Sequence, residues 1–584
     1  MKHYLKTVII IVAGFLIAPE ISGQFVHHLE GPKVPWTKAP QVKGDNFRFV
    51  IISDLTGGEK EGVFAAVVEK INQLAPDFVM CVGDLIDGYT IDSLIMQKQW
   101  KSFHDRITKL NAPFFYMPGN HDVANEMLYK EWIRQFGCDF YSFYISKSLF
   151  IILNAYEHDQ GELSDKQVQY VKKVLQQHNS DDPVYIFSHP PLWDLYEKKG
   201  LDELEPLFYR YKTTFFCGDD HHYIMKDVKG HTHYMLSNTG GGFDRENISL
   251  GIFNHILWVT SSSGKLTIAN ILTDGIIPTD IVDNTTEKQV YTFLGDGWVN
   301  IRPTFSSESS AGSFKSDLTA FNNGDFPLYL KGSFVKKEKL RFEPDSFDFT
   351  IPAGELITLP VTLYNSGNFD IDELPEPEAD ITGRFVQDSK TIENSYRKKW
   401  IIDNLKYCIP DGGMIKEIVC DKPGFIEESW SWTGPEDGSF KFTASFDKEN
   451  IWLKITTSDD ILIVDSLNRE KPQEKLFINF SADTTLKNED YLIVEMTGGN
   501  NPLIRSNKNY PKTVVKGACT VRNRKLVADV AMPIKNLNGD FFRLNIGFRD
   551  QDDLTSIDQS ILWWRPKWGS RADYTGSGMF KLIR

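Results

Sequence analysis

From residue 46 to about residue 272, two kinds of hydrophobic pattern alternate along the chain. Short continuous apolar runs, such as FRFVIIS (47–53) and DFVMCVG (77–83), predict buried strands. Between such runs, residues 63–75, 91–110 and 164–177 place apolar side chains at helical spacing. Strands that alternate with helices indicate βαβ units and a largely buried sheet. Strands dominate towards residue 272, as expected for the second sheet of a sandwich.

The helical signals fade after residue 283, and a period of two replaces them. From about residue 297 to residue 384, stretches such as FPLYLKGSF (326–334) and ITLPVTLYN (357–365) predict an immunoglobulin-like β-sandwich. The acidic, proline-containing stretch ELPEPEAD (373–380) is typical of an exposed loop or linker. The last ~200 residues are again rich in predicted strands.

Length, charge and the N-terminus narrow the class of protein. A chain of 584 residues is too long for one core, so several domains are expected. A net charge of −15 argues against a nucleic acid as the main partner. A basic start, a short apolar run and a small-residue exit predict a signal peptide that is cleaved after Gly23, and hence a secreted or periplasmic protein. No later segment offers the ~18 uninterrupted apolar residues of a membrane span.

The six cysteines give no zinc-binding spacing. Cys81 and Cys217 end predicted core strands and are expected to be small buried apolar residues. Cys408 and Cys420 are near one another in sequence, and a disulfide between them is an open alternative.

Five short polar motifs stand where apolar runs end. They are SDLTGG (53–58), GDLID (83–87), GNHD (119–122), SHPP (188–191) and GDDH (218–221). One such motif alone is an ordinary strand-to-turn junction, since Gly, Asn and Asp suit tight turns. Five in this order resemble the calcineurin-like metallophosphoesterases, over roughly residues 47–272. The resemblance implies a four-layer α/β sandwich that hydrolyses phosphate mono- or diesters.

Two divalent ions ~3.5–4 Å apart can activate a water and neutralise phosphoryl oxygens. The resemblance implies a ligand set for each ion: Asp54, Asp84 and His221 for the first, and Asp84, Asn120, His189 and Asp219 for the second. His121 takes the position that protonates the leaving group or stabilises the transition state. Asp122 is expected to orient the imidazole of His121.

Two residues depart from the pattern of the family. Thr56 stands where a histidine ligand is usual, and Asp219 replaces the first histidine of a Gly-His-x-His motif. Three carboxylates leave two divalent ions with a net charge of about +1, which weakens the attraction for phosphate. An oxygen-rich ligand set favours Mn²⁺, Mg²⁺ or Ca²⁺. We expect two ions, with Mn²⁺ first and Zn²⁺ or iron as alternatives.

A literal Gly-His-x-His occurs at residues 230–233, so His231 and His233 are alternative ligands. The polar stretch before them is typical of a hairpin turn, and the strand TTFFCG before Gly218 favours residues 218–221 instead. Trp193, His222 and Tyr223 lie close to the motifs in sequence and are either substrate contacts or structural residues.

The last 200 residues resemble a family 9 carbohydrate-binding module, a β-sandwich with aromatic sugar contacts. The resemblance is carried by DKENIWLKITTSDD (447–460), LFINF (476–480) and the tryptophan-rich end of the chain. It implies polysaccharide binding, with stacking or core packing as alternatives for each tryptophan. The candidate stacking residues are Trp430, Trp432, Trp563, Trp564 and Trp568.

The predicted organisation is a multidomain chain: a signal peptide (1–23), an α/β metallophosphoesterase sandwich (24–285), an immunoglobulin-like β-sandwich (286–385) and a larger C-terminal β-sandwich (386–584). Two hypotheses of function follow. The first is a secreted metal-dependent phosphoesterase that acts on phosphate esters, including glycan-associated ones. The second is a carbohydrate-binding protein whose phosphoesterase domain has lost turnover through Thr56 and Asp219.

Overall fold

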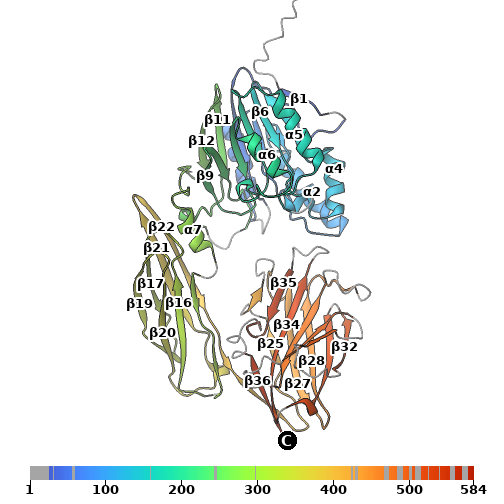
Figure 1. Ribbon diagram of the computed structural model, residues 1–584, viewed down its shortest axis with the longest axis vertical. Helices are drawn as coiled ribbons and strands as arrows, with labels where there is room; N and C mark the ends of the chain where they lie inside the picture. The colour runs from blue at the N-terminus through green and yellow to red at the C-terminus, as the bar shows by residue number, and fades with distance from the viewer. Residues whose placement is uncertain are drawn as a thin grey trace, which may run out of the picture.

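The chain is described here by a computed structural model (Figure 1). It describes residues 25–584 except 30–31, 56–59, 158–159, 243–245, 296–297, 309, 422–424, 428–431, 466–472, 483–490, 499–502, 507–514, 524, 538, 553–558 and 568–576. Two features of the sequence lie outside the described residues. They are the predicted cleavage site after Gly23 and Thr56, which stands where a histidine ligand is usual.

Two sheets form the centre of the N-terminal domain. The first has seven strands in the spatial order β1 (Phe25–His27), β5 (Tyr141–Ile145), β6 (Ser148–Ile152), β7 (Pro183–Phe187), β8 (Lys212–Cys217), β10 (His231–Met235) and β9 (Ile224–Val228). The second has six, in the order β13 (Ile276–Ile277), β12 (Lys265–Ile271), β11 (Ile256–Ser262), β2 (Asn46–Ile52), β3 (Phe78–Cys81) and β4 (Phe114–Phe115).

Helices cover the outer faces of both sheets, which gives the predicted four layers (Figure 1). The covering helices are α1 (Val63–Leu74), α2 (Ser93–Ile107), α4 (Glu126–Phe136), α5 (Asp165–Gln177) and α6 (Leu201–Phe208). Two further helices are the short α3 (Asn120–Val123) and α7 (Glu287–Leu294), which lies next to the following domain. Buried residues of α1, α2 and α4 belong to the core cluster that contains β2 and β3. Those of α5 and α6 pack on β6, β7 and β8.

The strands that carry the motifs run parallel to their neighbours. In the six-stranded sheet β2 pairs with β3 and β3 with β4 in parallel. In the seven-stranded sheet β6, β7, β8 and β10 are parallel in succession. Parallel strands end at one edge of their sheet, so the polar turns that follow β2, β3, β7 and β8 are brought together.

Two four-stranded antiparallel sheets follow and form the predicted immunoglobulin-like sandwich. One has the order β14 (Val299–Ile301), β16 (Ser313–Phe321), β20 (Leu356–Asn365) and β18 (Leu340–Glu343). The other has the order β19 (Ser346–Ile351), β17 (Leu328–Phe334), β21 (Glu378–Gln387) and β22 (Lys390–Lys399). Two short strands, β15 (Thr304–Ser306) and β23 (Ile402–Asn404), pair in parallel beside it.

The end of this sandwich differs from the prediction. The boundary placed after residue 385 falls inside the β21–β22 hairpin, in which the two strands pair from Glu378↔Lys399 to Gln387↔Lys390. The sheet therefore extends to Lys399. The sequence of β22, KTIENSYRKK, is mostly polar and shows no clear alternation, so it gave no strand signal. Residues 378–380 of the predicted loop ELPEPEAD are likewise the start of β21.

The sandwich shares a continuous core with the N-terminal domain. Val290 and Phe293 of α7 lie in one cluster of buried residues with Met235 of β10 and Leu318 of β16. Polar contacts accompany it, because Lys390 of β22 forms an ion pair of 2.7 Å with Asp283. The apolar side chains of α7 therefore pack against both domains, so the two domains are joined by a shared core as well as by the chain between them.

The C-terminal sandwich consists of one eight-stranded and one five-stranded sheet. Its eight-stranded sheet contains β24 (Lys406–Pro410), β36 (Gly578–Ile583), β34 (Phe541–Gln551), β29 (Lys475–Ser481), β30 (Leu492–Met496) and β31 (Leu503–Ser506), with β35 (Gln559–Trp563) and β26 (Ile426–Glu427) at the side of β34. Its five-stranded sheet has the order β25 (Ile418–Cys420), β27 (Gly438–Phe446), β28 (Asn450–Asp459), β33 (Lys525–Pro533) and β32 (Lys516–Arg522).

Three of the five candidate stacking tryptophans lie among the described residues, and none of the three is exposed. Trp563 and Trp564 are 6% and 8% exposed and pack on Phe477 and Phe442. Trp432 is half-buried and donates its indole N–H to a backbone carbonyl. These three are therefore core residues, the second of the two alternatives. Trp430 and Trp568 lie outside the described residues.

The six cysteines are free thiols, so the disulfide alternative for Cys408 and Cys420 is wrong. Cys408 is exposed on β24 of one sheet, whereas Cys420 is buried on β25 of the other. Cys81 and Cys217 are buried in the N-terminal core, as predicted. Among the helices of the described part of the chain, none has the length and apolar character to cross a membrane.

The aromatic packing of α4 yields a prediction about stability. Trp132 is fully buried against Trp100 and Phe136, so Trp132→Ala should leave a cavity and lower the free energy of unfolding of this domain by about 3–5 kcal/mol. The control is Leu94→Ala on α2, where the side chain is 72% exposed and the change should be about 0.5 kcal/mol or less. Urea titration of both variants measures the difference, and equal effects would contradict the packing described.

Candidate metal centre

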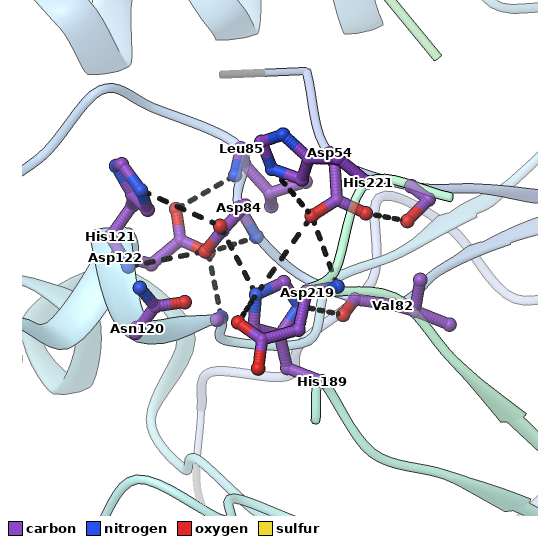
Figure 2. Close-up of polar contacts among 12 residues, drawn as sticks. Asp54, Val82, Asp84, Leu85, Asn120, His121, Asp122, His189, Asp219 and His221 are labelled. Carbon is purple, nitrogen blue, oxygen red and sulfur yellow. Dashed lines mark hydrogen bonds and ion pairs between the residues drawn. The ribbon is translucent and has the colours of Figure 1, made fainter. Parts of the chain in front are cut away.

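Five turns bring the predicted ligands to one place, at the shared edge of the two sheets (Figure 2). Asp54 follows β2, Asp84 follows β3 and Asn120 is the first residue of α3. His189 follows β7, and the turn after β8 supplies the remaining two ligands, Asp219 and His221.

The distances between the ligand atoms form a chain of close contacts. Nε2 of His189 lies 3.1 Å from Oδ2 of Asp84 and 3.4 Å from Oδ1 of Asp219. Nε2 of His221 lies 3.5 Å from Oδ1 of Asp54. Metal bonds of about 2.0–2.2 Å at right or tetrahedral angles put ligand atoms about 3–3.5 Å apart, so these spacings fit coordination of common ions.

His189 is the ligand with the most close neighbours in the cluster. It lies near Asp84 and Asp219, which share the second predicted set with it, and 4.0 Å from Asp54 of the first set. Asp54 also lies near His221, the histidine of the first set. Ligand atoms of Asp54, Asp84 and His189 all lie within 4.8 Å of one another, which places Asp84 between the two sets. Asp84 is therefore the carboxylate in position to bridge two ions.

Two buried ligand atoms have no hydrogen-bond partner in the described part of the chain. They are Nε2 of His189 and Oδ1 of Asn120. Nδ1 of His189 lies 2.6 Å from the carbonyl oxygen of Val82, which can only accept, so Nδ1 is a donor and Nε2 is the nitrogen that an ion would bind in place of a proton. Buried polar atoms are normally paired. The orphaned atoms and the oxygen-rich donor set fit a pair of divalent ions.

The charges of the cluster perturb one another strongly. Burial raises the pKa of Asp54 well above its ordinary value, although the neighbouring His189 opposes the rise. Burial acts in the same direction on Asp84, but His189 and His121 outweigh it and lower its pKa to about 2. Burial lowers the pKa of His189, yet Asp84 and Asp219 raise it well above the usual range. Buried carboxylates thus create a site that attracts positive charge.

The turns hold four of the ligands in an uncommon backbone conformation. Asp54, Asp84, Asp219 and His221 have φ angles of 35°, 57°, 79° and 55°. The left-handed region costs a non-glycine residue roughly 1–2 kcal/mol. Strain of this kind persists where the surrounding structure enforces it, and it often marks a functional site.

Asp122 has a different contact from the one expected. Its buried carboxylate accepts N–H groups of Asp84, Leu85 and Gly119, each at 2.9 Å, and a fourth from Ile86 at 3.2 Å. These bonds fix the turn after β3 against the start of α3. Since its oxygens are engaged with the backbone, Asp122 does not contact the ring of His121.

The imidazole of His121 is oriented by the backbone instead. Its Nδ1 lies 2.6 Å from the carbonyl oxygen of Asp87, so this nitrogen is the donor and Nε2 faces the cluster, 3.8 Å from Oδ2 of Asp84. The ring also meets Tyr89 edge-on, with centroids 4.7 Å apart. The backbone carbonyl of Asp87 therefore has the orienting role that was expected of Asp122.

The alternative histidines are not part of the centre. His233 is buried and stacks on Phe215, with ring centroids 4.0 Å apart, and His231 packs on Tyr209. Both lie on β10, so the choice of residues 218–221 agrees with the geometry. His222 is 4% exposed and packs on Tyr291, so it belongs to the core.

Three residues of the centre had no motif to identify them. Tyr89 accepts a hydrogen bond of 2.8 Å from the Asn120 amide, which leaves Oδ1 of Asn120 for an ion. Tyr156 donates a hydrogen bond of 2.8 Å to Oδ2 of Asp219, and Gln160 contacts the same oxygen. Burial, followed by the charge of Asp219, raises the pKa of Tyr156 well above its ordinary value, so its hydroxyl stays a donor.

The glycine of GNHD yields a prediction about metal binding. A Cβ on Gly119 would overlap Oδ1 of Asp84 and lie 2.5 Å from the Asp84 nitrogen, so Gly119→Ala should displace the bridging carboxylate. We expect the purified variant to lose most of its bound metal in elemental analysis. Gly275→Ala is the matched control, because a Cβ there meets no atom within 4 Å. Full metal content in Gly119→Ala would contradict the bridging position of Asp84.

Comparison with solved structures gives two kinds of neighbour. A dimetal phosphatase from Danio rerio aligns with a TM-score of 0.30 and 13% identity, over 40% of this chain and 98% of that chain. A family 9 carbohydrate-binding module from Caldicellulosiruptor kristjanssonii, in complex with cellotriose, aligns with a TM-score of 0.23 and 11% identity, over 30% and 93%. Both scores are low, so neither similarity says what this chain binds or hydrolyses.

Comparison of sequences gives a match to the N-terminal domain. Two curated proteins, the serine/threonine-protein phosphatase CPPED1 of Rattus norvegicus and of Mus musculus, are each 27% identical over 176 residues, which is 27% of this chain and 53% of theirs. The chain thus spans about half the length of the curated relatives it matches. The family model of calcineurin-like phosphoesterase matches residues 47–223, a range that contains all five motifs, so this part of the chain is a calcineurin-like phosphoesterase domain.

Proposed function

We propose that the protein is a metal-dependent phosphoesterase that hydrolyses phosphate mono- or diesters at a dinuclear centre. One observation carries the proposal: six ligand side chains converge on one cluster, in which buried Nε2 of His189 and Oδ1 of Asn120 have no hydrogen-bond partner among the described residues. Two divalent ions bound there would supply an activated water and neutralise the phosphoryl oxygens.

His121 is the proposed general acid. Its Nδ1 donates to the carbonyl of Asp87, so Nε2 is the nitrogen that faces the cluster. In the imidazolium form Nε2 carries a second proton, and it gives this proton to the leaving alcohol. Asp122 supports this step indirectly, since it fixes the backbone of both motifs next to His121.

We propose Mn²⁺ as the preferred ion. Three carboxylates, Asp54, Asp84 and Asp219, and the amide oxygen of Asn120 make the ligand set richer in oxygen than in nitrogen. Such sets favour Mn²⁺ and other oxygen-preferring ions over Zn²⁺. With two divalent ions the three carboxylates leave a net charge of about +1, enough to attract an anionic ester.

A pocket of about 310 Å³ beside Asn120 is the proposed site of the alcohol part of the substrate. Its walls include the tyrosines Tyr89, Tyr129 and Tyr156. Aromatic walls next to the ligands of the second ion suit a sizeable organic group attached to the phosphate.

The proposal extends to the location and the C-terminal sandwich. The composition of residues 1–23 supports export, so we propose that the protein acts in the periplasm or outside the cell. The C-terminal sandwich would hold the enzyme near glycan. With Trp563 and Trp564 buried, the candidate sugar contacts from the sequence are Trp430 and Trp568, outside the described residues.

Hydrolysis of a chromogenic phosphomonoester and phosphodiester tests the function directly. We expect turnover with Mn²⁺, loss of turnover on treatment with a chelator, and recovery when Mn²⁺ is returned. Asp84→Ala should abolish activity and metal uptake together, because Asp84 faces both ligand sets. Wild-type protein that binds no divalent ion and turns over neither ester would refute the enzyme and favour the carbohydrate-binding hypothesis.

The pocket is tested with a bulky aryl ester. Tyr129 lines the pocket without contacting a metal ligand, so Tyr129→Ala should raise KM by about 2- to 10-fold and leave kcat nearly unchanged. The control is Tyr329→Ala on β17, a tyrosine of similar exposure outside the pocket. An unchanged KM in Tyr129→Ala would exclude the pocket as the alcohol site.

A further inference from the structure

The two carboxylate oxygens of Asp219 have separate surroundings. Oδ1 lies on the side of the ligand cluster, 3.4 Å from Nε2 of His189. Oδ2 points away from it and accepts two hydrogen bonds, from the Tyr156 hydroxyl at 2.8 Å and from the Gln160 amide at 3.1 Å. The Gln160 amide also donates to the Tyr156 hydroxyl at 3.1 Å, so the three groups form a closed triangle.

This triangle restrains a carboxylate that would otherwise have two ways to bind. A free carboxylate can bind an ion through one or both oxygens. With Oδ2 held by two donors, Asp219 presents Oδ1 alone. The donors to Oδ2 also disperse part of its negative charge, so Asp219 adds less negative charge to the centre than a free carboxylate would. Hydrogen-bond partners of metal ligands commonly fix ligand orientation in this way.

We propose that Tyr156 and Gln160 are positioning residues for the second metal ion, holding Asp219 as a ligand through Oδ1 alone. The inference rests on the metal centre of the proposed function and not on turnover. Tyr156 also lines the pocket beside Asn120, so the same residue that orients Asp219 can contact the substrate. Neither residue belongs to any of the five motifs.

The test measures metal binding without substrate. Wild-type protein and the variants Tyr156→Phe and Gln160→Ala are titrated with MnCl₂, and the affinities of the two ions are determined separately. We expect the Kd of the second ion, whose ligands include Asp219, to rise about 10- to 100-fold in Tyr156→Phe, with the first ion unaffected. Gln160 is exposed, so Gln160→Ala should fold normally and show a smaller rise.

Two controls separate positioning from general damage. Tyr129→Phe removes a hydroxyl from the same pocket, but that hydroxyl contacts Asp139 at 3.3 Å and no proposed ligand, so both affinities should stay at the wild-type level. In an Asp219→Ala background, adding Tyr156→Phe should change the second Kd no further, since a double-mutant cycle isolates the pair.

The proposal is overturned if wild-type protein binds fewer than two ions, or if Tyr156→Phe and Gln160→Ala bind the second ion as tightly as wild type. It is also overturned if Tyr156→Phe has its full effect in the Asp219→Ala background. Two bound ions with no hydrolysis of any ester would refute the proposed function alone, because the titration involves no substrate.

Discussion

The arrangement of the N-terminal domain depends on the burial of several carboxylates around one histidine. Asp54, Asp84 and His189 are at most 1% exposed, and Nε2 of His189 lies within 4.0 Å of an oxygen of each carboxylate. Burying charge is unfavourable unless opposite charge compensates it. The pKa values of Asp54 and His189 are raised well above their ordinary values, so the metal-free cluster favours bound protons on both groups. The same demand makes the cluster a site for divalent ions.

Backbone hydrogen bonds and one close backbone approach hold these charged side chains in place. Asp122 accepts four N–H groups from two motifs, so the turn after β3 and the start of α3 are held as one unit. Gly119 permits the close approach, since any side chain there would overlap Asp84. In the opposite sheet, the Asp219 nitrogen donates to Oδ1 of Asp54 at 3.2 Å. The two sheets are therefore joined at the centre by hydrogen bonds as well as by their apolar core.

The sequence predicts the N-terminal fold and the turns that carry the proposed ligands, because both depend on local signals. Apolar runs and turn residues identify β2, β3, β7 and β8, and the parallel arrangement follows from their alternation with helices. The sequence does not predict features that depend on contacts between residues far apart in the chain. The polar strand β22 is held by pairing with β21, and the Asp87 carbonyl that orients His121 carries no side-chain signal at all. Burial of Trp563 and Trp564 likewise depends on packing between strands far apart in sequence.

The segment that carries Tyr156 shows how a loop can share the rigidity of the core. Gln167 of α5 is fully buried and holds the segment from inside: its side chain accepts the Asn154 N–H at 2.9 Å and donates to the Asn154 carbonyl at 3.0 Å. The same amide donates to Glu157 at 2.7 Å. Residues 154 and 157 are thus fixed on both sides of Tyr156. Because α5 packs on the outer face of the seven-stranded sheet, the position of the Tyr156 hydroxyl beside Asp219 is determined by helix–sheet packing and not by the loop alone.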